Sequence, residues 1–165
     1  MAAFVTCRSP DERSVLTKAS TLVFSGPIPV ASLASSLAGL RVNADEGDQL
    51  RDRLRHITRR ITDHARSIGL IVENHIDFPA LTIVLGSVSR VIRGCQIAWE
   101  HGILLTPAVF PALPLERGGL RLSVTASNTN SDVDVLLRAL SAVRDELGAT
   151  ELADRSASYA GTFEF

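Results

Sequence analysis

Arg121 is the residue whose type and setting most clearly suggest chemistry. It lies within Leu120–Thr125, where leucine and valine alternate with polar residues in the pattern of a strand. A guanidinium is planar, stays charged at every working pH and pairs with a carboxylate through two hydrogen bonds. The pattern leaves two interpretations open for Arg121, namely a carboxylate-binding group and one half of a surface ion pair.

Ser25 stands at a turn, because glycine and two prolines follow it in Gly26–Pro29. These residues break regular structure and precede a helix that we expect from Val30 to about Arg41. A small hydroxyl at the turn before a helix suits a phosphate oxygen. It is equally consistent with a serine that only forms the entry to the helix.

Lys18 is the only lysine of the chain, and Thr17–Ser20 superficially resembles a Schiff-base site. A lysine in that role has to be desolvated. Nothing in the flanking sequence predicts burial, so we expect Lys18 on the surface of a helix.

The histidines and cysteines lack the spacing of metal ligands or of a disulfide framework. Cys7 and Cys95 lie far apart in sequence and have no basic neighbour that would activate a thiol. We therefore predict no metal site and no reactive cysteine. Solvated or locally bonded side chains are expected for all four histidines, His56, His64, His75 and His101.

Alternating elements must position these residues, which predicts a layered α/β fold of the α+β type. We expect a short, mostly antiparallel sheet with helices over one face. Its predicted strands are Leu70–Val72, Leu81–Leu85, Ile103–Thr106 and Leu120–Thr125, and Ala3–Cys7 is a further short strand.

Apolar periodicity and capping residues predict the helices. Ser9 caps the first, and Asn43–Asp48 is an acidic turn before a separate helix that ends at Gly69. That helix has one apolar stripe, and the six arginines on it are expected to be solvated. The stripe consists of Leu50, Leu54, Ile57, Ile61, Ala65 and Ile68. Two later helices are expected: one from Ser87 or Ser89 to Trp99, and one capped by Asn130 or Ser131 and ended by Gly148.

The composition suits a globular domain without polyanionic partners. The 165 residues are 45% hydrophobic and carry a net charge of −1, which allows a core and gives no indication of nucleic-acid binding. No apolar run is long enough to span a bilayer, and charged residues from Arg8 to Arg13 interrupt any signal-peptide pattern. Two distant cysteines fit a reducing compartment, so we predict a cytoplasmic protein.

Three segments together resemble the C-terminal part of the α-oxoamine synthases. Leu22–Pro29 is similar to the family's Phe-Ser/Thr-x-x-Leu-Pro-Pro stretch, and Gly102–Pro114 to its Gly-(Ile/Val) strand and Pro-x-Val-Pro loop. Leu120–Asp134 resembles Arg-Leu-Arg-(Ile/Leu)-x-x-(Ser/Thr)-Ala-x-His-Thr-x-Glu-Asp-Ile-Asp. The family consists of enzymes that depend on pyridoxal 5′-phosphate (PLP) and condense an amino acid with an acyl-CoA.

The resemblance implies the small C-terminal domain of a fold type I PLP-dependent transferase. Residues 1–29 would be a remnant of the large PLP-binding domain. Residues 30–148 would form the small domain together with the start of the interdomain helix, and 149–165 a loosely ordered tail.

The resemblance also implies roles for single residues. Arg121 matches the arginine that binds the amino-acid carboxylate, and Ser25 matches a hydroxyl that reaches the PLP phosphate across a dimer interface. Asn128 replaces a family histidine, and we expect its amide to hydrogen-bond locally. Asp132 and Asp134 match the family, and the dipole of the helix that they begin is a sufficient explanation for both.

The catalytic lysine of the family is expected outside this sequence. It precedes a Gly-Gly-aromatic step that Ala2–Phe4 occupies here, so it would lie upstream of Met1. We therefore expect no catalytic residue in this chain and no activity from it alone. Within a homodimer, or with a longer PLP-enzyme partner, its substrates would be an amino acid and an acyl-CoA.

Two alternatives remain open at this point. One is a fragment of a PLP-dependent aminotransferase, since that superfamily shares the fold and the carboxylate-binding arginine. The Phe-Ser-x-x-Ile-Pro stretch within Leu22–Pro29 favours the acyltransferase. The other is a non-catalytic binding or regulatory subunit.

Overall fold

The computed structural model describes residues 5–73 and 77–148. The chain divides into two compact units, with the division between Gln49 and Leu50. The predicted strand at Ala3–Cys7 falls partly outside the described residues, and Val5–Cys7 have no strand geometry. The predicted tail, 149–165, also lies outside them.

The first unit consists of helices. α1 (Pro10–Thr17) begins as predicted, because the Ser9 hydroxyl accepts a hydrogen bond from the Glu12 amide at 3.2 Å. α2 is one turn long (Ser20–Val23). α3 (Val30–Ser67) begins in this unit and ends in the second.

The predicted turn at Asn43–Asp48 is wrong, because α3 runs through it without a break. This segment has no proline and only one glycine, Gly47, which costs a helix about 1 kcal/mol relative to alanine. Residues of both flanking helices favour helix, so a single glycine does not separate them.

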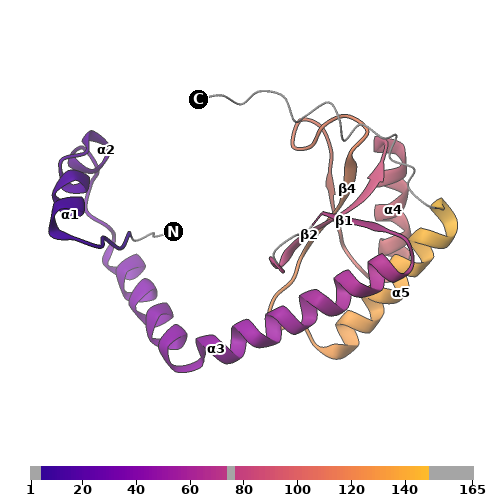
Figure 1. Cartoon of the computed structure of the whole chain (residues 1–165), viewed down its shortest axis with the longest axis horizontal. Helices are drawn as coiled ribbons and strands as arrows, with labels where there is room; N and C mark the ends of the chain where they lie inside the picture. The colour runs from indigo at the N-terminus through magenta and orange to yellow at the C-terminus, as the bar shows by residue number, and fades with distance from the viewer. Residues whose placement is uncertain (1–4, 74–76, 149–165) are drawn as a thin grey trace. The chain divides into compact units, whose positions relative to one another are not determined.

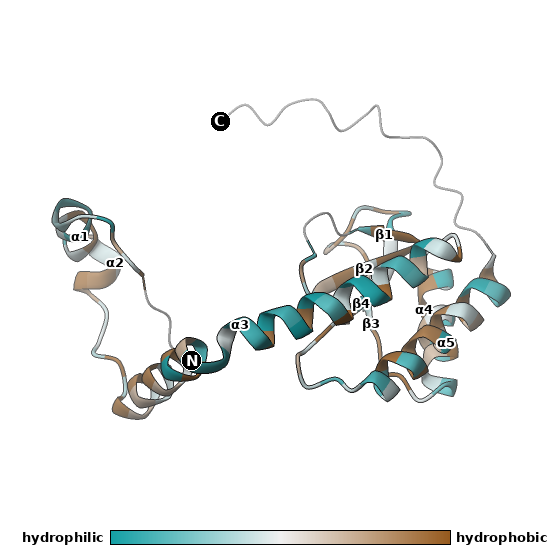
Figure 2. Cartoon of the chain, turned by 60° about the horizontal axis from the view of Figure 1, so that its bottom comes forward, coloured by the Kyte–Doolittle hydropathy of each residue, from teal (hydrophilic) through white to brown (hydrophobic). Residues whose placement is uncertain are grey.

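The described part of the first unit has no buried large apolar side chain. Figure 2 shows α2 and the first turns of α3 coloured largely as hydrophobic, and these side chains face solvent. Phe24 is 88% exposed and Val30 is 82% exposed. The other exposed apolar residues here include Val15, Leu22, Val23, Ile28, Leu33 and Leu37.

The second unit is built on a four-stranded antiparallel sheet of order β1-β2-β4-β3. This confirms the predicted antiparallel sheet. Strands β1, β2 and β4 are labelled in Figure 1. The strands are β1 (Ile71–Glu73), β2 (Ala80–Gly86), β3 (Thr106–Ala108) and β4 (Gly118–Ser123).

Local hydrogen bonds explain where the strands differ from the prediction. β3 begins only at Thr106, because the Ile103 amide still bonds to Ala98 at the end of a helix, at 2.9 Å. β4 ends before Thr125, whose amide donates to the Asn128 side chain at 2.8 Å. An amide that is used in a turn is not available to a sheet.

Two helices complete the unit, α4 (Val88–Glu100) and α5 (Asn130–Leu147). Ser87 precedes α4 as predicted, whereas Thr129, and not Asn130 or Ser131, caps α5. Gly69 and Gly148 have φ values of +78° and +71° and end α3 and α5, which confirms both predicted stops.

The core lies between one face of the sheet and the three helices. Alternate residues of β2 and β4 enter it, as the pleat of a strand requires. The stripe on α3 contributes Ile57, Ile61 and Ala65, which are nearly fully buried, as predicted. The remaining core residues include Leu81, Ile83, Leu85, Val91, Ile97, Leu120, Leu122, Val133, Leu140 and Val143.

Polar side chains fasten α3 to the region of α5. Arg60 pairs with Asp134, and Arg53 donates to the Asn128 carbonyl at 3.2 Å. The His64 ring bonds across to Leu137 and Ser141, at 3.1 and 3.0 Å. The prediction of a solvated arginine face therefore misses Arg53, Arg60 and also Arg59, which pairs with Asp77 at 2.7 Å. His64 is bonded between helices.

The close approach of β2 and β4 leads to a stability prediction. A methyl group added at Gly119 would lie 2.4 Å from the Ile83 carbonyl oxygen and 2.9 Å from the Thr82 methyl. Gly119→Ala should therefore lower the free energy of unfolding by about 3 kcal/mol, at the upper end of overpacking costs. Urea unfolding followed by circular dichroism measures this change. Gly39→Ala is the control, because it meets nothing within 4 Å, and equal midpoints for the two variants would contradict the close approach.

Candidate functional site

Arg121 occupies the middle of β4, an inner strand of the sheet. The strand register places it opposite Thr82 of β2 and Thr106 of β3. Its neighbours Leu120 and Leu122 are buried in the core, so Arg121 faces the other side of the sheet, where it is exposed.

A cavity of about 340 Å³ adjoins Arg121. We call it the Arg121 cavity. Its walls come from α3, from the connection between α4 and β3, from β4 and from the start of α5. Its polar lining residues are Thr106, Arg121, Ser123, Asn128 and Asp132.

Within the described ranges, the Arg121 side chain makes no hydrogen bond or ion pair. Its direct cross-strand neighbours are threonines, which have short side chains and no charge. Among the described residues, no acid is therefore paired with this guanidinium. A carboxylate-binding group requires such an unpaired guanidinium.

Asn128 closes the turn between β4 and α5. Its side-chain oxygen accepts from the Thr125 amide at 2.8 Å and from the Thr125 hydroxyl at 3.2 Å. The predicted local bonding of Asn128 is confirmed. The side chain fixes the loop that forms one wall of the Arg121 cavity.

Asp132 holds the first turn of α5 together. Its carboxylate accepts from the Thr129 amide at 2.8 Å, and the Thr129 hydroxyl accepts from the Asp132 amide at 3.2 Å. Two hydrogen bonds with Thr129 lower the pKa of Asp132. The bond from the Thr129 amide has the larger effect, and the bond with its side chain has the smaller one. The helix dipole alone was an incomplete explanation, since Asp132 forms a capping box and Asp134 an ion pair with Arg60.

Ser25 and Lys18 belong to the first unit, and Arg121 belongs to the second. The Ser25 hydroxyl donates to the Leu22 carbonyl at 2.6 Å, just after α2. Lys18 follows α1 and is exposed, as expected for a surface position.

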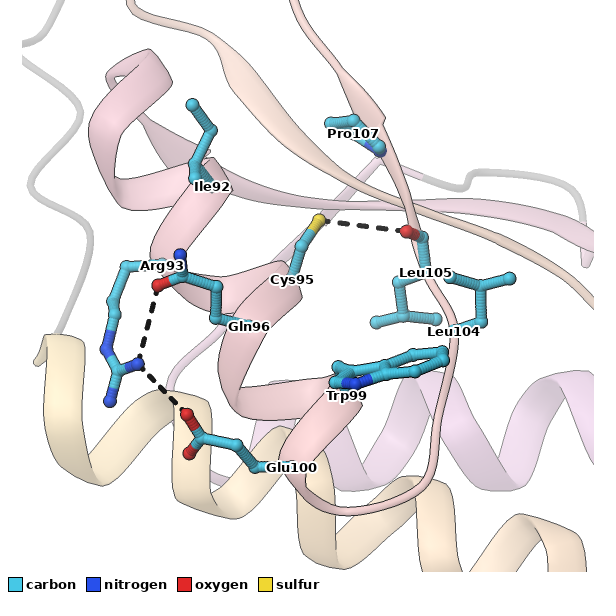
Figure 3. A pocket seen from close by; sticks show the side chains of 9 residues that line it. All are labelled: Ile92, Arg93, Cys95, Gln96, Trp99, Glu100, Leu104, Leu105 and Pro107. Atoms are coloured by element: carbon cyan, nitrogen blue, oxygen red, sulfur yellow. Dashed lines mark hydrogen bonds and ion pairs between the residues drawn. The ribbon is translucent and has the colours of Figure 1, made fainter.

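A second hollow, of about 650 Å³, lies along α4 and the chain that follows it (Figure 3). Its single cationic lining residue, Arg93, is already held by Glu146 at 2.5 Å and Glu100 at 3.2 Å. Burial raises the pKa of the Cys95 thiol, whose sulfur lies 3.7 Å from the Leu105 carbonyl. This hollow therefore presents neither a free cation nor a reactive thiolate, in keeping with the expectation for Cys95.

Sequence patterns alone did not identify every residue around the site. Thr82 and Thr106 flank Arg121 only because of the strand register, which no local motif reveals. Thr58 and Thr62 on α3 are buried, and neither side-chain oxygen has a hydrogen-bond partner in the described structure. Their places directly after Ile57 and Ile61 were the signal for a wider buried face. No group of residues that could hold a metal occurs in the described chain, and His75 lies outside it.

Curated proteins of known activity are similar to this chain, although no protein-family model matches it. The 8-amino-7-oxononanoate synthase of Sodalis glossinidius is 32% identical over 139 residues, which cover 84% of this chain and 35% of that enzyme. Its counterpart in Maricaulis maris is 29% identical over 88% of this chain and 36% of its own. Serine palmitoyltransferase 2 of Saccharomyces cerevisiae is 26% identical over a match that covers 86% of this chain and 26% of that enzyme. The chain thus spans about a third of the length of these relatives, or less.

Solved structures show the same correspondence. Serine palmitoyltransferase of Sphingomonas wittichii matches with a TM-score of 0.73 at 21% identity, over 84% of this chain and 35% of that one. An 8-amino-7-oxononanoate synthase from Francisella tularensis matches with a TM-score of 0.69 at 20% identity, over 86% and 40%. At this level of identity the likeness establishes a shared fold for the matched part.

The capping box gives the stability of α5 a predictable pH dependence. The folded-state pKa of Asp132 is lowered, so its contribution is present above the pKa of the unfolded state and is lost as the pH falls through the folded-state pKa. Asp132→Asn should therefore reduce the free energy of unfolding at pH 7, and the difference from the unsubstituted protein should shrink in acid. Urea unfolding between pH 2 and 7 tests this, and Asp145→Asn on the exposed face of α5 is the control. A difference that does not depend on pH would contradict the assignment.

Proposed function

Because this chain belongs to the α-oxoamine synthase family, we propose that it forms the C-terminal part of a PLP-dependent acyltransferase that condenses an amino acid with an acyl-CoA. Its own contribution would be to bind the carboxylate of the amino acid through Arg121. The fold agrees, since the antiparallel sheet with its helices is that of the C-terminal domain of fold type I PLP-dependent transferases.

The observation that carries this proposal is the setting of Arg121. The guanidinium has no partner in the described structure. Arg121 is one of the residues that line a cavity of about 340 Å³, and it stands on an inner strand that its neighbours hold on both sides. A rigid strand presents a binding group with less positional freedom than a loop. Arg121 also lies in the Leu120–Asp134 segment that matches the family pattern.

Holding the carboxylate would contribute orientation as well as affinity. A charge-assisted hydrogen bond contributes about 1.5–3 kcal/mol, and a bidentate pair also fixes the plane of the carboxylate. With the carboxylate fixed, the bonds at the substrate Cα have one orientation. Orientation of this kind removes part of the entropic barrier to a reaction.

PLP supplies an electron sink for carbanion chemistry in enzymes that bind it. The described residues do not form a cradle for it: Lys18 is exposed, and the Ser25 hydroxyl donates to the Leu22 carbonyl. We propose Ser25 as one contact to the cofactor phosphate, for which its hydroxyl would have to turn away from Leu22. The other cofactor contacts would come from elsewhere in the complete enzyme.

The first unit supports association with further protein. Its apolar side chains from Val15 to Leu37 find no core within the unit, and apolar surface of this extent is typical of an interface. We propose that a second copy or a longer PLP-enzyme chain covers it. No helix of the described structure is long and apolar enough to cross a membrane.

The exposed apolar side chains of the first unit also favour a second candidate, a subunit without catalytic activity. Such a subunit would bind the carboxylate of a substrate beside a longer PLP enzyme, which would provide the Schiff-base lysine. Co-purification with a longer partner, and acyl-CoA-dependent product formation only when both are present, would distinguish it. The names of the relatives support the acyltransferase over the aminotransferase alternative.

Carboxylate binding by Arg121 can be tested on the chain itself. Arg121→Ala should weaken the binding of glycine, alanine or serine about 10–100-fold, since a charge-assisted hydrogen bond is lost. The affinity of Arg121→Lys should fall between those of Arg121→Ala and the unsubstituted chain, because an ammonium keeps the charge but lacks the bidentate fork. Chemical-shift titrations by NMR provide the measurement, with the corresponding amino-acid amides as ligand controls. Arg138→Ala, at an exposed arginine of α5 outside the cavity lining, is the protein control, and equal binding by Arg121→Ala and Arg138→Ala would contradict the proposal.

A further inference from the structure

A row of four residues crosses the sheet on the face that carries Arg121. The register places Glu73 of β1 opposite Thr82 of β2, Thr82 opposite Arg121 of β4, and Arg121 opposite Thr106 of β3. Directly opposed residues in a sheet extend their side chains to the same face. Glu73 is the only acidic residue in the four strands and Arg121 the only basic one.

Glu73 is therefore an internal competitor for the guanidinium of Arg121. Adjacent strands lie about 4.8 Å apart, so β1 and β4, with β2 between them, are separated by roughly 10 Å. A glutamate and an arginine can together span that distance, and the side chain between them, Thr82, is short. Left alone, Glu73 could pair with Arg121 and occupy the group that a substrate carboxylate needs.

In the structure the Glu73 carboxylate is paired with a different arginine. A guanidinium nitrogen of Arg117 pairs with the Glu73 carboxylate, although Arg117 lies well outside the row, just before β4. The turn before it is fixed, because the Arg117 amide donates to the Pro114 carbonyl at 3.1 Å and Glu116 has a φ of +66°. The two side chains are 49% and 31% exposed, so water reaches the pair but does not surround it.

We propose that Arg117 is a positioning residue that holds Glu73 away from Arg121 and so keeps Arg121 open to a substrate carboxylate. This inference rests on the proposed function of Arg121. It also has an electrostatic component, since the three groups together carry one net positive charge on this face. Without Arg117 the charges of Glu73 and Arg121 would cancel, and an incoming anion would experience a weaker attraction.

The test combines three variants with two measurements. The variants are Arg117→Gln, Glu73→Gln and the double substitution, all in the full chain. The first measurement is the NMR signal of the Arg121 side-chain Nε–H without ligand, which reports whether its guanidinium is paired. The second is the affinity for glycine and alanine from chemical-shift titration.

We expect Arg117→Gln to shift the Arg121 signal, to slow its exchange with water and to weaken amino-acid binding about 3–10-fold, as for competition by a partly exposed ion pair. Glu73→Gln alone should leave the affinity unchanged or raise it. The double variant should regain the affinity of the unsubstituted chain, because no competitor remains. A purely structural role of Arg117 would not give this rescue.

Each result decides between distinct claims. An unchanged Arg121 signal in Arg117→Gln, or a double variant as weak as Arg117→Gln, would overturn the inference. If the unsubstituted chain binds no amino acid although the Arg121 signal shifts in Arg117→Gln, the competition by Glu73 is supported and the proposed function of Arg121 fails instead.

Discussion

The antiparallel pairing of β2 with β4 is the constraint on which the rest of the second unit depends. Ile83 and Leu120 pair across it and are buried, while Thr82 and Arg121 pair on the opposite face. Shifting the register by one residue would turn Arg121 into the core and Leu120 out of it. The cost of burying an unpaired guanidinium makes that alternative unfavourable. The apolar residues of β4 and its single arginine thus specify the same register.

Gly119, which directly precedes Leu120, restricts the pairing of β2 with β4 further. Gly119 lies where a side chain would collide with the backbone of β2, so the two strands approach one another more closely than larger residues would allow. Another part of the cavity wall is the segment between β4 and α5. Asn128 fixes the turn after β4, and Thr129 with Asp132 caps α5. The residues that border the cavity are therefore held by backbone geometry and by local hydrogen bonds, and not by contacts with Arg121 itself.

Local patterns predicted most of the second unit because its signals are local. The stripe on α3, the alternation in Leu120–Thr125 and the glycines at 69 and 148 each determine their element within a few residues. The misplaced boundaries arise where tertiary or capping hydrogen bonds decide, as at Ile103 and Thr125. The tertiary contacts of Arg60, His64 and Arg117 join residues that are far apart in sequence. No periodicity predicts such pairs, so the environment of Arg121 became visible only in the folded chain.

The two units differ in where their apolar side chains lie: those of the second unit form a core, and those of the first unit are exposed. The second unit encloses a core that links one sheet face with α3, α4 and α5, so its cavity is defined by its own residues. The first unit buries no large apolar side chain within the described residues, although its helices are rich in leucine and valine. Helices of this kind obtain most of their stability from packing, because isolated ones are marginal in water. The proposed carboxylate binding would thus depend on the second unit alone, whereas the proposed contribution of Ser25 would depend on a further protein that covers the first unit.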